Sequence, residues 1–153
     1  MAFQILKEAE KFGFIIEGLG AHSGRTMMLI DLQRLITSCD PITSVEGYGQ
    51  AIVDDNVLLK KTGAARKESF SRLRRLYGLN KEMLLFRVLR KLWDHGTDNQ
   101  ELLVLLYAIA RDPILRTSAD LIIDTPVGTA LSAPDFSKAV ETKFSGQLTI
   151  KTL

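Results

Sequence analysis

Cysteine is almost absent from this chain of 153 residues, in which Cys39 is the only one. A single thiol cannot close an internal disulfide, and the first residues lack the basic, then apolar, then small-residue order of a secretory signal. We therefore expect a reducing, cytoplasmic setting.

Long apolar runs are also missing. The longest uninterrupted one covers residues 102–110, whereas a membrane-spanning helix needs about 18 or more apolar residues in succession. The sequence thus predicts no transmembrane helix and no membrane partner.

Sequence motifs for catalysis and for cofactors are absent as well. The chain contains no G-x-S-x-G, H-E-x-x-H or G-x-x-x-x-G-K-[ST] segment. Gly18, Gly20 and Gly24 follow an apolar stretch, but the last comes one residue too late for a dinucleotide-binding loop. His22 and His95 stand at no zinc-like spacing from each other or from the cysteine. We expect no catalytic residue, no metal and no cofactor, and hence a non-enzymatic protein.

The composition that remains is typical of a folded protein, with 46% hydrophobic and 25% charged residues. The length suits one domain with one core, so we expect a single helical domain over residues 1–153. An apolar pattern begins at Leu148, Ile150 and Leu153 without a stop signal. We therefore expect that a further C-terminal element is lacking.

Helix start signals recur along the whole chain, and no convincing strand alternation appears in its middle part. We expect an all-α, compact multi-helix fold, with room for a short hairpin or extended segment at the ends; the type of the N-terminal segment to residue 22 stays open. The expected N-terminal caps are Ser23, Thr43, Thr62, Asn80, Asp98, Asp112 and Ser132. The expected stops are Asp40, Asp54, Gly78, Gly96, Thr125 and Phe144. The helix after Asp98 is apolar all round over residues 102–107, so we expect other elements to surround it.

Charge is unevenly distributed. Residues 60–91 contain eleven basic and two acidic residues, a net charge of +9, while the rest of the chain has nine basic and sixteen acidic residues, a net charge of −7. A local field of one sign attracts polyanions, although the whole chain carries only +2. Six of the eleven basic residues are arginine, whose guanidinium fork suits phosphate.

Helical periodicity divides this basic block into two amphipathic helices. In the helix from Thr62 to Tyr77, an apolar stripe through Phe70, Leu73 and Leu76 leaves the basic side chains and Ser71 on the other side. We expect Tyr77 and Trp93 to pack in the core rather than to stack on bases.

In the helix from Asn80 to His95, the leucines and Val88 predict a broad buried side, and the basic residues occupy the remaining arc. The apolar set is Leu84, Leu85, Val88, Leu89 and Leu92. The predicted nucleic-acid-binding residues of both helices and the preceding linker are Lys60, Lys61, Arg66, Lys67, Arg72, Arg74, Arg75, Arg87, Arg90 and Lys91. The main hypothesis is sequence-tolerant contact with the phosphate backbone of duplex DNA. The alternatives are a soluble surface paired with the chain's own acids, an adaptor that docks an acidic partner subunit, and RNA binding.

Four segments together resemble the BrxA family of BREX bacteriophage-exclusion systems. They are IVDDNVLLKKT at residues 52–62, RLRRL at 72–76, LLVLLYAIA at 102–110 and GAHSGRT at 20–26, and the likeness spans about residues 18–124. The resemblance implies a non-enzymatic accessory factor that binds DNA beside larger defence proteins. It also implies a helical fold similar to that of the NusB antitermination factor, and a chain that continues past the end of this one. Neither the residues nor the resemblance predicts an oligomeric state.

Overall fold

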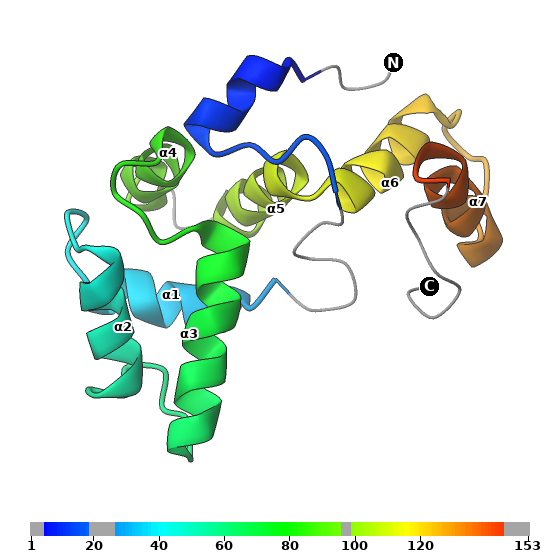
Figure 1. The fold of residues 1–153 in the computed structure, drawn as a ribbon. Helices are drawn as coiled ribbons and strands as arrows, with labels where there is room; N and C mark the ends of the chain where they lie inside the picture. The colour runs from blue at the N-terminus through cyan, green and yellow to red at the C-terminus, as the bar shows by residue number, and fades with distance from the viewer. Residues whose placement is uncertain (1–4, 19–26, 96–98, 146–153) are drawn as a thin grey trace.

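The computed structural model describes residues 5–18, 27–95 and 99–145, and all regular structure within them is helical (Figure 1). The elements are η1 (Lys7–Phe12), α1 (Leu29–Ser38), α2 (Val45–Val53), α3 (Gly63–Tyr77), α4 (Leu84–Trp93), α5 (Gln100–Arg111), α6 (Pro113–Asp124) and α7 (Ala133–Lys143). The expected all-α, compact helical fold is confirmed. No helix in the described part of the chain is both long and apolar enough to cross a membrane.

The helices from α1 to α5 enclose the hydrophobic core. Its fully buried side chains include Leu35 of α1, Tyr48 of α2 and Leu73 of α3, and α4 and α5 add Phe86 and Val104. The ring of Phe86 meets that of Tyr48 edge-on, with centroids 5.9 Å apart. These contacts join α2 to α4, which lie far apart in the sequence.

Helices α2 and α3 pack closely because of Gly49. A side-chain carbon at this position would lie 3.2 Å from the ring of Phe70, tighter than an ordinary van der Waals contact. The two glycines of α2 reduce its intrinsic helix propensity, but Gly49 lets the two backbones approach each other.

Helices α6 and α7 form a hairpin at the far end of α5 (Figure 1). No residue of this hairpin belongs to the main core cluster found among the described residues. The hairpin buries Val140 and, just after α7, Phe144. It is linked to the rest of the domain through α5 and through Arg116, which donates to the carbonyl oxygen of Ile15 at 2.9 Å.

Several predicted helix boundaries are confirmed by hydrogen bonds. Thr62 accepts from the N–H of Ala65 at 3.1 Å, and Gly78 ends α3 with φ 78°. Asp112 accepts from the N–H groups of Ile114 and Leu115, ahead of Pro113. Such caps satisfy donors that an isolated helix end leaves unpaired, and their effect is local.

Other boundaries differ from the prediction. Ser44 caps α2 by accepting from Gly47, one residue after the expected Thr43. Asn80 does not cap α4; its side chain accepts from the N–H of Glu82 within a turn, and the helix begins only at Leu84. Helix α1 begins at Leu29, because Met28 has a left-handed conformation with φ 50°.

Some predictions fall outside the described residues. They concern the Ser23 and Asp98 caps, the Gly96 stop, the GAHSGRT segment, the first four residues and the apolar pattern that begins at Leu148. Of the N-terminal segment, the described residues 5–18 contain the 3-10 helix η1.

The prediction that α5 is buried on all sides is wrong. Leu102 and Leu106 are 55% and 56% exposed, and Leu105 is 38% exposed. The helix packs against α3, α4 and α6, which cover only the side that carries Val104, Tyr107 and Ala108. Its apolar outer side lies at the surface of the described domain.

Candidate nucleic-acid interface

The solvent face of α3 carries the cations that the sequence predicted there. Leu73, Leu76 and Tyr77 are buried and turn one side of the helix to the core. At about 100° per residue, Lys67, Ser71, Arg74 and Arg75 then lie on the opposite side, and all four are exposed. We call these four residues the α3 face.

The three cations of the α3 face are not neutralised within the described residues. The ion pairs found there join Lys60 to Asp31, Arg72 to Glu68, and Lys143 to Asp120. None includes Lys67, Arg74 or Arg75. The α3 face therefore presents positive charge to solvent.

Glu46, on the neighbouring α2, is an acidic side chain that interacts electrostatically with Arg74. The pKa of Glu46 lies below its ordinary value, mainly because its carboxylate accepts a hydrogen bond from its own backbone N–H and then from Ser44. Arg74 makes only the smallest contribution to this shift. The interaction is long-range and leaves Arg74 free to bind another anion.

Arg72, another predicted residue of α3, is half-buried. It donates a hydrogen bond of 2.6 Å to Glu68, one helical turn away. An ion pair of this kind at the protein surface stabilises a helix by a few tenths of a kcal/mol. Arg72 is therefore less available to a partner than Arg74 and Arg75.

Two predicted arginines point into the protein. Arg90 is only 6% exposed, and its guanidinium donates to the carbonyl oxygens of Ile36 at 2.9 Å and Cys39 at 2.7 Å. Arg66 is half-buried and donates to the carbonyl oxygen of Val53 at 3.2 Å. The expectation that Arg90 faces solvent is wrong, because it caps the C-terminal carbonyls of α1.

The linker before α3 contributes one paired and one free lysine. Lys60 lies 2.9 Å from both carboxylate oxygens of Asp31, which fixes it against α1. Lys61 is exposed and has no carboxylate partner in the described part of the chain.

The orientation of α4 differs from the prediction. Phe86, Leu89 and Trp93 form its buried side together with Arg90. Leu84, Val88 and Leu92, expected in the core, are 42%, 42% and 46% exposed. Arg87 and Lys91 are exposed, as expected. We call Leu84, Arg87, Val88, Lys91 and Leu92 the α4 face.

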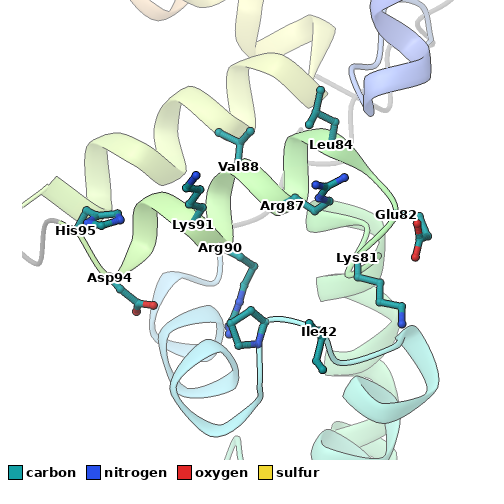
Figure 2. Close-up of a pocket in the computed structure, with 11 residues that line it drawn as sticks. Ile42, Lys81, Glu82, Leu84, Arg87, Val88, Arg90, Lys91, Asp94 and His95 are labelled. Atoms are coloured by element: carbon teal, nitrogen blue, oxygen red, sulfur yellow. The ribbon is translucent and has the colours of Figure 1, made fainter.

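An open hollow of about 1070 Å³ lies beside α4, between this helix and the loop that joins α1 to α2. Figure 2 shows Arg90 pointing from α4 towards the loop, with Ile42 and Lys81 on the loop side and Val88 and Leu84 on the opposite side of the helix. Arg87 and Lys91 lie along α4 between them.

The two basic faces line different hollows. Ser71, Arg74 and Arg75 border a smaller one of about 420 Å³ beside Phe70. Lys81, Arg87 and Lys91 border the larger one next to α4. The structure brings the predicted cations together as two groups.

The aromatic side chains next to the basic block are buried. Tyr77 is fully buried, and Trp93 is 4% exposed. Their expected core role is confirmed. Burial also raises the pKa of the Tyr77 hydroxyl.

Two further arginines, which the sequence did not single out as structural, are also buried. Arg111 donates to the carbonyl oxygens of Leu76 at 2.8 Å and Gly13 at 2.6 Å. Arg116 donates to those of Ile109 at 3.1 Å and Ala110 at 2.9 Å. A signal for Arg111 was its place directly after the apolar run of residues 102–110, where a buried cation must find internal acceptors.

No group of three or more His, Cys, Asp or Glu side chains within the described ranges is placed to hold a metal ion. Cys39 is half-buried, and burial raises the pKa of its thiol, partly opposed by Arg90. A raised pKa disfavours the reactive thiolate.

No family model matches this chain, and neither the curated proteins nor the solved structures include a match.

Proposed function

We propose that this protein is a non-enzymatic DNA-binding protein that contacts the phosphate backbone of duplex DNA through the α3 face. The observation that carries the proposal is the set of three exposed cations, Lys67, Arg74 and Arg75, without an ion-pair partner in the described residues. Lys61, exposed just before the helix, extends this set to four.

The composition of the α3 face suits phosphate. Arginine can bind two phosphate oxygens with its planar fork, and the hydroxyl of Ser71, between the cations, can add a neutral hydrogen bond. Like charges spaced along one helix face repel each other by a few tenths of a kcal/mol per pair. A polyanion that lies along α3 would remove this repulsion.

The proposed contact set is smaller than the one predicted from the sequence. Arg66 and Arg90 bind backbone carbonyls, and Lys60 and Arg72 bind carboxylates. These four side chains would have to break internal contacts before they could bind phosphate. The proposal therefore rests on Lys61, Lys67, Arg74 and Arg75.

The test is the affinity for a labelled DNA duplex, measured across a series of salt concentrations. About four neutralised phosphates predict a log–log slope near −3.6, because each contributes about −0.9. The variant Arg74→Glu with Arg75→Glu should bind more weakly and have a slope near −1.8.

The matched control is Arg87→Glu with Lys91→Glu, which changes the net charge by the same amount on a different face. This control should keep the wild-type slope. A slope near zero for the wild type, or equal losses in both double variants, would contradict binding through the α3 face.

The BrxA resemblance supplies the biological context of the proposal, an accessory role beside other proteins of a BREX-like phage-defence system in the cytoplasm. The all-helical fold agrees with that resemblance at the level of fold class. The NusB likeness makes RNA the alternative polyanion. Competition between duplex DNA and structured RNA separates the two, because A-form RNA presents a narrow major groove and 2′-hydroxyls.

A further inference from the structure

The α4 face is divided lengthwise into an apolar row and a basic row. Leu84, Val88 and Leu92 follow each other at steps of four residues, and so do Arg87 and Lys91. Residues four apart lie one above the other on a helix, so the two rows run side by side along α4. The three apolar side chains are 42–46% exposed.

The apolar row forms a surface of its own on α4. Ile42, in the loop between α1 and α2, is 75% exposed and borders the hollow on the loop side, whereas Leu84 and Val88 lie on the opposite side of the helix (Figure 2). Exposed apolar side chains that follow each other along one helix face mark a contact site more often than isolated ones do. A phosphate backbone could not cover them, because it offers charge and no comparable apolar surface.

The surface is also held in a fixed shape. Arg90 crosses from α4 to the end of α1, where it binds the carbonyl oxygens of Ile36 and Cys39 (Figure 2). On its inner side α4 is anchored by Phe86, Leu89 and Trp93. A preformed surface loses little conformational entropy when a partner binds.

The charges around the hollow favour an acidic partner. Lys81, Arg87 and Lys91 are exposed, and none of them belongs to an ion pair of the described residues. Arg90 adds a fourth positive charge at the loop side, while Glu82 and Asp94 add two negative charges to the lining. The lining therefore carries a net positive charge.

We propose that the α4 face docks an acidic amphipathic helix of a partner protein. A helix with apolar residues at i, i+3, i+4 and i+7 would cover Leu84, Val88 and Leu92 with its apolar stripe. Acidic residues beside that stripe would meet Arg87 and Lys91, which border the hollow.

This proposal is independent of DNA binding, since it uses a different face from α3. The probe is a synthetic helical peptide about 20 residues long, with leucines at the four spaced positions and glutamates on both flanks. A second peptide has lysines in place of the glutamates. Binding to the full chain is followed by fluorescence anisotropy, and the site is located by amide chemical shifts.

We expect saturable binding of the glutamate peptide in the micromolar range, with the largest amide shifts in residues 81–95. Arg87→Glu with Lys91→Glu should weaken binding about tenfold or more, and Val88→Asp should do the same through the apolar row. The matched control Arg74→Glu with Arg75→Glu should bind like the wild type. Thermal melts of all variants establish that they are folded.

Five outcomes would overturn the proposal. The first three concern the peptides: the lysine peptide binds as tightly as the glutamate peptide, the glutamate peptide fails to bind, or it shifts amides elsewhere. In the fourth, the same amides shift as the protein alone is concentrated, which would assign the α4 face to a second copy of this chain. In the fifth, duplex DNA shifts these amides and competes with the peptide, which would assign the face to nucleic acid.

Discussion

Arg90 of α4 donates a hydrogen bond of 2.9 Å to the carbonyl oxygen of Ile36 near the end of α1, 54 positions earlier in the chain. The last carbonyls of a helix lack partners within the helix and carry partial negative charge, so a guanidinium both satisfies and neutralises them. The same arrangement occurs at the ends of three other helices. Arg66 binds at the end of α2, Arg111 at the end of α3 and Arg116 at the end of α5.

Arg90→Ala should destabilise the fold by about 2–3 kcal/mol, because it leaves the carbonyl oxygens of Ile36 and Cys39 without this donor. Arg87→Ala is the matched control on the same helix. Its side chain is exposed, so the change should stay within about 0.5 kcal/mol. The free energies of unfolding come from urea titrations, and equal losses in the two variants would contradict the capping role.

Arg111→Lys should cost about 2 kcal/mol although it keeps the charge. The guanidinium contacts carbonyl oxygens of Leu76, Gly13 and Arg75, which lie in different directions, and one ammonium group cannot replace this planar fork. Burial already lowers the pKa of Arg111, and a buried lysine would lose its proton more readily. Exposed Arg75→Lys is the control, for which urea unfolding should show almost no change.

Tyr107→Phe and Tyr48→Phe remove the same hydroxyl from two buried positions and should differ in effect. The hydroxyl of Tyr107 donates to the carbonyl oxygen of Tyr77 at 2.6 Å, so its loss should cost about 1 kcal/mol. The hydroxyl of Tyr48 is buried and has no hydrogen-bond partner among the residues that the structure describes. Its removal should leave the free energy of unfolding unchanged or raise it. A clear loss in Tyr48→Phe would reveal an acceptor for that hydroxyl.

The start of α7 should weaken at acid pH. The Asp135 carboxylate accepts from the hydroxyl of Ser132 at 2.6 Å and from its backbone N–H at 2.8 Å, and these bonds lower the pKa of Asp135. A lowered pKa means that the stabilising effect is present above the pKa of the unfolded chain, near 3.9, and is lost as the pH falls through the folded value. An NMR titration that follows the carboxyl carbon of Asp135 should give a lower midpoint in the folded protein than in the chain unfolded by urea. Equal midpoints in the two states would contradict the cap.

The helices could be predicted mainly where a local cap marks their start. Thr62 and Asp112 bind N–H groups two or three residues later, so a short stretch of sequence contains both partners. The predicted start of α4 was wrong because the side chain of Asn80 makes an equally local hydrogen bond, with the N–H of Glu82, within a turn. Asparagine occurs both at helix starts and in turns, and only the surrounding fold selects between the two.

The candidate site was predictable in part for a similar reason. The side of α3 is decided by the strong stripe of Leu73, Leu76 and Tyr77, so the exposure of Arg74 and Arg75 followed from helical periodicity. In α4 the apolar residues occupy more than one side, and periodicity alone allows several rotations about the helix axis. The side that faces the core was therefore predicted incorrectly.

The sequence by itself determined that the described chain folds into helices, where several of them begin and end, and that positive charge gathers between residues 60 and 91. These properties depend on composition and on hydrogen bonds between near neighbours. Only the tertiary structure decided which of those charges remain available. The carbonyl groups that bind Arg66 and Arg90 come from helices 13 and more than 50 residues away. The positions of these carbonyl groups depend on how the core packs. The same packing turns Arg90 inward and leaves Leu84, Val88 and Leu92 at the surface.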